Sequence, residues 1–309
     1  MIKLNISDQV KEAQKQNRPI VAIETTVLTH GLPSPHNIET AHKIFDIISD
    51  HSVQPAFIAI ADHKIQIGLS KDELSSLART PNVLKTNRSN LSYCLMSGKT
   101  GATTVSTTMQ CAALANIKIM TTGGIGGVHR DFANCYDISS DLTTLSDRQV
   151  AVICSGTKSI LDIPKTLEHL ETLGIPIIGY QTNCFPSFYT YDERYPVVQK
   201  CQNVDEITKI LSLHFSLDKS GLLITNPIPK KFALSTSQIE NWLSKAMHDQ
   251  RANKISGREA TPYLLEKMYQ YSEGKTLKAN QELLYANASL AAQIASAFQK
   301  EKTVKMEKN

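Results

Sequence analysis

Short runs of apolar and β-branched residues recur along this 309-residue chain, separated by segments with helical spacing. Most of the runs are nearly continuous in apolar character, which is typical of strands that are covered on both faces. They occupy residues 19–28, 55–61, 64–69, 117–122, 150–156, 175–180 and 221–226. The alternation predicts an α/β fold with a largely parallel sheet between helical layers.

The segments between the runs carry recognisable helix signals. Ser70 and Glu73 form a capping box, and residues 104–114 form a small-residue segment that can pack closely. Helical spacing then dominates the C-terminal part, over residues 237–250, 262–273 and about 276–300. No linker, repeat or low-complexity segment interrupts the chain, so we expect a single domain over 1–309 with a helical C-terminal layer, ordered from about 5 to 300, and a frayed tail at 301–309.

Bulk composition excludes several classes of protein. The net charge is only +4, and the basic residues are spread along the chain rather than clustered, so nucleic acid is not expected as a partner. No stretch of about 18 apolar residues predicts a membrane span, and the N-terminus lacks the apolar core of a signal peptide. The six cysteines never approach CxxC spacing, which indicates buried thiols in a reducing compartment. We therefore expect a cytoplasmic enzyme or binding protein without a membrane partner.

The segment 123–141 joins a glycine-dense turn to a histidine, an arginine and two acids. Glycine occupies positions 123, 124, 126 and 127. Such density indicates either positive φ or close approach of the backbone to a ligand, and the exposed N–H groups of such a turn suit a phosphate. The spacing fits neither GxGxxG nor a P-loop, so an ordinary dinucleotide-binding fold is disfavoured.

Two side chains follow predicted strands at the edge where α/β enzymes bind ligands. Glu24 ends an apolar run, where it is either a solvated acid or a general acid, because a carboxyl group in an apolar setting keeps its proton to higher pH. Lys158 follows the run 150–156. It can bind phosphate, act as an amine nucleophile or simply cap a helix.

Asp137 and Asp141 lie four residues apart around two serines. Two acids at this spacing suit a hard cation such as Mg²⁺ or Mn²⁺, and equally suit a helix N-cap and a surface acid. Lys85 and Arg88 are either phosphate contacts or an ordinary basic turn. Arg130 could hold a phosphate, whereas a lone histidine such as His129 is more often structural.

Eight motifs in fixed order resemble one known family. They are AIETTVLTHGLP, GATTVSTTM, TTGGIGGVHR, DISSDL, SGTKSILD, GYQT, TNPIP and GREATPYLL. Together they resemble the pseudouridine-5'-phosphate glycosidase family, also called indigoidine synthase A-like, and the likeness runs in the same order from about residue 5 to 300. The resemblance implies a homotrimeric α/β/α enzyme with one divalent metal per subunit, commonly Mn²⁺. Such an enzyme reversibly splits pseudouridine 5'-phosphate into uracil and ribose 5-phosphate.

The resemblance also assigns roles to individual residues. By motif, Glu24 resembles the family's proton donor, Lys158 its imine-forming nucleophile and Asp137 its metal ligand. The positions that match substrate contacts are Lys85, Val105, Ser139, Ser140, Asp141 and Asn280. The departures are mild: Thr25 stands where serine is common, and Cys135-Tyr136 replaces a more familiar pair before the metal aspartate. Some relatives carry a fused sugar kinase, so a separate pseudouridine kinase is implied here as a functional partner.

The chemistry explains why such a family would use a lysine. The bond to be broken joins ribose C1' to uracil C5, so no glycosidic heteroatom is available for a conventional acid to protonate. An amine at C1' can instead expel C5 as an imine forms, provided that C5 is protonated. Two alternatives stay open: another lysine-imine phosphosugar lyase, and a non-catalytic regulator that binds sugar phosphates.

Overall fold

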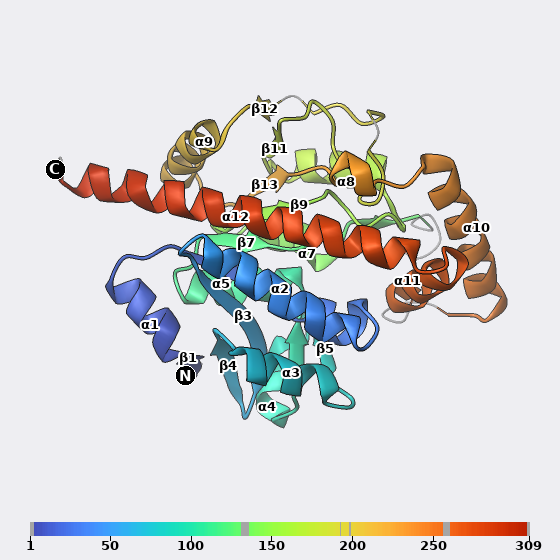
Figure 1. Ribbon diagram of the computed structural model, residues 1–309, viewed down its shortest axis with the longest axis horizontal. Coiled ribbons are helices and arrows are strands. Elements are labelled where there is room, and N and C mark those ends of the chain that lie inside the picture. Colours follow the sequence, from blue (N-terminus) through green and yellow to red (C-terminus); the bar gives the residue numbers. More distant parts are fainter. Residues whose placement is uncertain (1–2, 131–135, 192, 198, 256–259, 308–309) are drawn as a thin grey trace.

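The computed structural model describes residues 3–130, 136–191, 193–197, 199–255 and 260–307. In these residues, eleven strands form one sheet (Figure 1). Nine strands follow one path in the order β1 (Leu4–Ile6), β4 (Lys64–Ile67), β3 (Gln54–Ala61), β2 (Ile20–Ile23), β7 (Ile119–Thr121), β9 (Ala151–Cys154), β13 (Leu222–Thr225), β11 (Ile177–Tyr180) and β12 (Gln199–Cys201). Two more, β6 (Gly101–Thr103) and β5 (Leu84–Thr86), branch from β3. A separate pair consists of β8 (Val128–His129) and β10 (Leu161–Asp162).

The predicted largely parallel sheet is confirmed, and each of the seven apolar runs contains a strand. The pairs from β2 through β7, β9, β13 and β11 to β12 are all parallel. The exception is β3, which pairs antiparallel with β4 and with β6. Asp62 and His63, with φ of 51° and 61°, form the two-residue turn between β3 and β4, and positive φ at both positions matches the right-handed twist of a hairpin.

Successive side chains of the central strands point to opposite faces of the sheet. Val21 and Ile23 of β2 belong to one apolar cluster, whereas Ala22 between them belongs to the other. In β9, Ile153 and Val152 divide in the same way. A strand that alternates between two buried clusters must be apolar throughout, which explains the nearly continuous runs.

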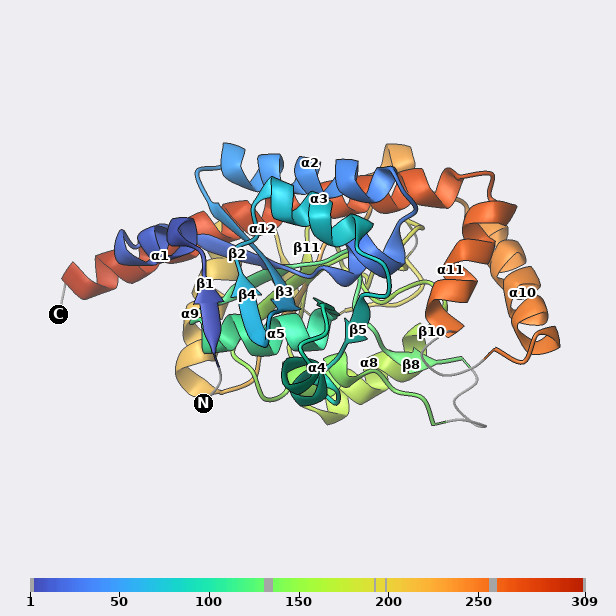
Figure 2. The same ribbon diagram turned by 90° about the horizontal axis from the view of Figure 1, so that it is seen from below.

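Helices cover both faces of the sheet (Figure 2). One cluster includes side chains from α2 (His36–Asp50), α9 (Val204–Leu217), α10 (Thr236–Ala252), α11 (Ala260–Tyr271) and α12 (Lys275–Glu307). The other includes α1 (Asp8–Lys15), α4 (Leu91–Ser97), α5 (Val105–Leu114), α7 (Ser140–Leu145) and α8 (Ile163–Thr172). The capping box of Ser70 and Glu73 is present at the start of α3 (Lys71–Arg79).

The longest helix, α12, crosses the sheet beside α2, and its C-terminal part extends past the other elements (Figure 1). It begins as predicted but continues to Glu307, so the segment expected to be a frayed tail is helical as far as that residue. Lysine and glutamate, which dominate the end of the chain, are good helix formers even without packing partners.

Most of the described cysteines are buried, as the sequence predicts. Cys94, Cys111, Cys154 and Cys201 are buried thiols that form no disulfide, Cys184 is a partly exposed thiol, and Cys135 lies outside the described residues. Burial raises the pKa of the Cys111 and Cys154 thiols to about 12, so both stay protonated at neutral pH.

Among the described residues, no helix has both the length and the apolar character needed to cross a membrane.

Candidate active site

The predicted functional residues gather at one edge of the sheet. Parallel strands end at the same edge, and in α/β proteins ligands bind there. A cavity of about 1270 Å³ opens at this edge. It is lined by every residue expected in the site: Glu24, Lys85, Val105, Asp137, Ser139, Ser140, Asp141, Lys158 and Asn280. The structure thus brings the whole predicted set together, while the role of each residue stays a prediction.

Glu24 follows β2 directly and is only 5% exposed, so the alternative of a solvated acid is wrong. Each of its carboxyl oxygens accepts a hydrogen bond from a hydroxyl group: Thr26 donates to Oε2 and Thr122 donates to Oε1. Thr122 follows β7, the strand next to β2. Two neighbouring strand ends therefore hold the carboxyl group in place at the wall of the cavity.

Lys158 lies in the segment between β9 and β10, and the next helix, α8, begins only at Ile163. Its expected alternative role as a helix cap is therefore wrong. The backbone N–H of Lys158 donates to the carbonyl of Ile125 at 3.1 Å, and the hydroxyl of Thr157 donates to the same oxygen. Within the described part of the chain, the Lys158 amine makes no hydrogen bond or ion pair, so it is available to a ligand in the cavity.

The glycines after β7 are needed for close packing rather than for positive φ, which none of the four adopts. A Cβ atom on Gly126 would lie 2.2 Å from the hydroxyl of Ser139, and one on Gly127 would lie 2.4 Å from the hydroxyl of Thr166. Two N–H groups of this turn bond to protein acceptors. That of Ile125 donates to the carbonyl of Gly156, and that of Gly126 donates to Asp141. The protein itself therefore uses two of the N–H groups that were expected to bind phosphate.

Asp141 supplies a negative charge beside this glycine turn. Its side chain accepts hydrogen bonds from the backbone N–H of Gly126 at 2.7 Å and from that of Ser106, near the start of α5, at 2.8 Å. The residue is only 4% exposed. A carboxylate at a helix N-terminus is stabilised by the unpaired N–H groups and the helix dipole. Asp141 consequently ties the glycine turn to α5, while Ser139 caps α7.

Asp137 is the more accessible of the two acids, with a side chain that is 37% exposed and 3.6 Å from Nε2 of His129. No group of three or more His, Cys, Asp or Glu side chains is arranged for a metal in the described ranges. One carboxylate beside the hydroxyl groups of Ser139 and Ser140 fits a hard cation, because Mg²⁺ and Mn²⁺ keep several waters and use few protein oxygens. The donor set is compatible with such an ion and unsuited to a closed structural zinc site.

Three basic side chains, those of Lys85, Lys158 and His30, line the cavity. Burial, and then the charge of Lys158, lowers the pKa of the Lys85 amine, against smaller opposing effects of Glu24, Asp141 and Asp137. Burial and the charge of Lys85 likewise lower the pKa of His30, whose ring is therefore neutral at pH 7. The cavity thus combines buried acids with lysines that compete for charge, a pattern that is common at functional sites.

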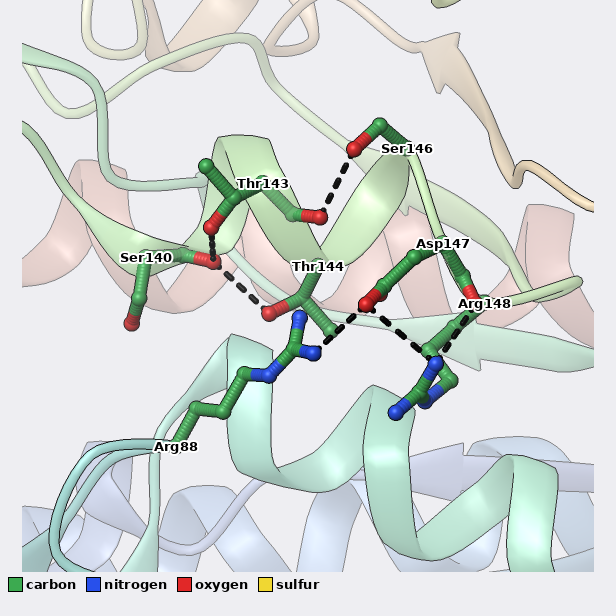
Figure 3. A network of polar contacts seen from close by, with 7 residues as sticks. All are labelled: Arg88, Ser140, Thr143, Thr144, Ser146, Asp147 and Arg148. Carbon is green, nitrogen blue, oxygen red and sulfur yellow. Dashed lines mark hydrogen bonds and ion pairs between the residues drawn. The ribbon is translucent and has the colours of Figure 1, made fainter.

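Arg88, the other predicted phosphate contact near Lys85, is used differently. Its guanidinium group pairs with Asp147 at 2.6 Å, and Arg148 lies 3.3 Å from the same carboxylate oxygen. Figure 3 shows this pair beside α7, whose hydroxyl groups on Thr143 and Thr144 donate to the carbonyl of Ser140. Both ion-pair partners are about one-third exposed, so the pair contributes roughly 0–1 kcal/mol of stability.

Other parts of the cavity wall were not predicted from the sequence. Phe188 and, from α10 and α11, Met247, Arg251 and Leu264 line the cavity. Thr122 belongs to the TTGGIGGVHR motif, but its local sequence does not indicate contact with Glu24. The apolar residues of α10 and α11 follow ordinary helical spacing, which gives the same signal for a cavity wall as for a core. Part of the GREATPYLL motif, at 257–259, lies outside the described residues, as does Cys135.

The fold and this strand-end site agree with one family of proteins. The family described as Indigoidine synthase A like protein matches residues 9–297, and the chain belongs to this family. The family membership predicted from the eight motifs is therefore confirmed.

Individual relatives are similar over nearly their whole length. Proteins named pseudouridine-5'-phosphate glycosidase from Caldanaerobacter subterraneus subsp. tengcongensis and Alkaliphilus metalliredigens are 44% and 45% identical to it. Each match covers 96% of this chain, and 97% and 96% of the relative. The expectation of an enzyme is thereby confirmed.

Two solved structures share the fold. The prealnumycin C-glycosynthase AlnA, in complex with ribulose 5-phosphate, is 30% identical with a TM-score of 0.90, covering 98% of this chain and 99% of its own. An indigoidine synthase A-like protein from Thermotoga maritima is 34% identical with a TM-score of 0.88, covering 96% and 97%.

Replacing Lys85 by methionine tests the electrostatics of the cavity. The folded state holds the Lys85 proton less firmly than the unfolded state does, so this residue costs stability below its lowered pKa. That cost disappears as the pH rises from the lowered pKa past the ordinary value of 10.5. We expect Lys85→Met to melt above the wild type at pH 7, with a gap that narrows toward pH 10 in thermal denaturation.

Lys64→Met is the matched control, because Lys64 is an exposed lysine on β4. We expect no gain in melting temperature from it at any pH in this range. A Lys85→Met protein that is less stable than the wild type at pH 7, or a gap that does not change with pH, would show that burial of this charge carries no cost.

Proposed function

We propose that this enzyme cleaves the C–C glycosidic bond of pseudouridine 5'-phosphate to give uracil and ribose 5-phosphate, reversibly and through an imine on Lys158. The observation that carries the proposal is the placement of two groups in the same cavity: a buried, doubly hydrogen-bonded acid, Glu24, and the amine of Lys158, which has no hydrogen-bond or ion-pair partner among the residues that the structure describes. The names of the similar glycosidases, and the sugar phosphate in the complex of the C-glycosynthase AlnA, support the substrate class.

The first step forms the covalent link. The neutral amine of Lys158 attacks C1' of the ribose, and the bond from C1' to the ring oxygen breaks as that oxygen takes up a proton. The product is an open-chain amine that still carries uracil at C1'. The hydrogen bonds that fix the backbone of residues 157 and 158 against Ile125 hold the nucleophile at a constant place in the cavity wall.

The second step breaks the C–C bond. The nitrogen lone pair forms the C1'=N double bond, the electrons of the C1'–C5 bond go to C5, and Glu24 supplies the proton that C5 takes up. Water then adds to the imine, releases ribose 5-phosphate and restores the amine. One water is consumed overall, and the reverse sequence joins uracil to ribose 5-phosphate.

The remaining residues bind and align the substrate in this proposal. Lys85 supplies positive charge, while the hydroxyl groups of Ser139 and Ser140 and the amide of Asn280 bind the sugar phosphate. Asp137 would hold a divalent cation, Mn²⁺ or another, one per subunit. When bound, the ion adds positive charge for the phosphate oxygens.

The family resemblance also supports proposals about the oligomeric state, the location and the source of the substrate. We propose that the enzyme works as a homotrimer in the cytoplasm. A separate pseudouridine kinase would supply its phosphorylated substrate.

Loss of the Lys158 amine is the first test. Wild-type protein incubated with pseudouridine 5'-phosphate and Mn²⁺ should release uracil, whereas Lys158→Ala should release none above background, because the covalent step is gone. Borohydride with ribose 5-phosphate should add one reduced sugar phosphate to Lys158 of the wild type, as measured by peptide mass spectrometry. Lys165→Ala, which removes an exposed lysine of α8, should keep wild-type turnover.

The outcomes separate the alternatives. A reduced adduct on Lys158 without uracil release indicates a different lysine-imine phosphosugar lyase. Binding of ribose 5-phosphate without any adduct indicates a non-catalytic regulator, and an adduct on another lysine overturns the assignment of the nucleophile.

Removing the proton of Glu24 is the second test. Glu24→Gln preserves the shape of the side chain, so we expect kcat to fall by about 10²–10⁴-fold while ribose 5-phosphate binds as before. The measurement pairs steady-state kinetics with calorimetric titration. Glu12→Gln, which alters an exposed side chain on α1, serves as the control. Turnover of Glu24→Gln at the wild-type rate would mean that the proton comes from another group.

The metal assignment has its own test. A cation held by one carboxylate and several waters binds weakly, so Asp137→Ala should lower activity in a way that added Mn²⁺ partly restores. Asp8→Ala, at a side chain that is 99% exposed, should leave the Mn²⁺ dependence unchanged. Wild-type turnover that is insensitive to chelators would remove the metal from the proposal.

A further inference from the structure

Asn287 is a fully buried polar residue in the middle of α12, and it does not line the cavity. Its neighbours one turn away on the same helix face include the apolar residues Leu283, Leu284 and Ala291. Burial of an amide is costly unless its donors and acceptor are paired. The position therefore calls for a reason other than packing, because an apolar side chain would serve a purely packing role at lower cost.

The amide group reaches the ends of three neighbouring strands. Its nitrogen donates to the carbonyl of Thr122 after β7 at 2.9 Å and to the hydroxyl of Ser155 after β9 at 3.1 Å. Its oxygen accepts from the side-chain nitrogen of Asn226 after β13 at 3.1 Å. Figure 1 shows α12 lying across these strands, so one side chain of the helix joins all three strand ends.

The segments that Asn287 joins are also the segments that carry the catalytic side chains. Thr122 donates to Glu24 through its hydroxyl group while Asn287 holds its carbonyl. Ser155 lies three residues before Lys158, and its N–H donates to the carbonyl of Gly123 at 2.8 Å. The two turns are thus bonded to each other, and Asn287 binds both of them.

We propose that Asn287 is a positioning residue that sets the separation and orientation of Glu24 and Lys158. It acts through Thr122 on the acid and through Ser155 on the turn that presents the amine. The expected effect on catalysis rests on the proposed function, whereas the expected effect on the geometry of the two turns does not. A misplacement of about 1 Å between reacting groups is enough to lower turnover by about 10²-fold.

The experiment compares Asn287→Ala with Ile294→Ala. Ile294 is a fully buried residue of α12 in the apolar cluster, so its truncation also destabilises the helix but leaves the strand ends paired. We expect Asn287→Ala to lower kcat for uracil release by about 10²-fold with KM changed by less than about threefold. Ile294→Ala should lower the melting temperature while keeping kcat. Equal kcat in the two variants overturns the inference.

Hydrogen exchange measured by mass spectrometry gives a readout that is independent of activity. Asn287→Ala should speed exchange in peptides that cover residues 122–127 and 155–158, and Ile294→Ala should leave these peptides as protected as the wild type. If wild-type protein releases no uracil, the proposed function fails, and the exchange comparison still decides the positioning role. Unchanged protection of both turns in Asn287→Ala overturns that role.

A milder variant covers the case in which Asn287→Ala does not fold. Asn287→Ser replaces the amide by a shorter hydroxyl group with a single donor, which cannot bond Thr122, Ser155 and Asn226 at the same time. We expect it to fold and to show the same two localised changes in exchange, with a smaller loss of kcat. A folded Asn287→Ser protein with wild-type kcat and wild-type exchange contradicts the proposal.

Discussion

The register of the parallel sheet is the constraint on which the site depends. Ile23 of β2 pairs with Thr121 of β7, and Thr121 in turn pairs with Ile153 of β9. Glu24 and Thr122 are the next residues of their strands, so the hydrogen bond between them follows from the register. A slip of one residue in β2 would turn Glu24 to the other face of the sheet, and a slip in β7 would turn Thr122, so either slip would separate the two side chains.

Around this edge the protein stabilises buried charge with its own polar groups. Asp141 accepts hydrogen bonds from a backbone N–H of α5 and from one of the glycine turn, and Glu24 accepts hydrogen bonds from two hydroxyl groups. For Lys85, the nearby acids do not outweigh burial and the charge of Lys158, so the pKa of its amine is lowered. The acids are thus held in fixed places by donors from distant segments, while positive charge at the cavity wall is left for a ligand to neutralise.

The extent to which sequence predicts this structure follows from the range of each interaction. Local periodicity is enough for seven of the strands and for the C-terminal helices, but the short strands β1, β5, β6 and β12 lie outside the apolar runs. The position of Glu24 and Lys158 at the ends of predicted strands is enough to place them at the functional edge. Burial of Glu24 depends on Thr122, nearly one hundred residues away, and no local pattern contains that contact. The density of glycine predicts an anion site, yet one of the turn's N–H groups, that of Gly126, bonds to Asp141 instead. The hairpin at Asp62 and His63 lacks the glycine or asparagine that usually marks positive φ.

The position of α12 in the chain has a consequence for synthesis on the ribosome. A nascent chain that has emerged as far as β13 already contains both predicted catalytic side chains and all strands of the sheet. On the face with Val21, Ile119 and Ile153, the strands β2, β7 and β9 then still lack α12, which packs on all three. Exposed apolar strands are a target for chaperones and a risk for aggregation. Protection of the nascent sheet and assembly of the active site therefore wait for the same event, the docking of the last helix.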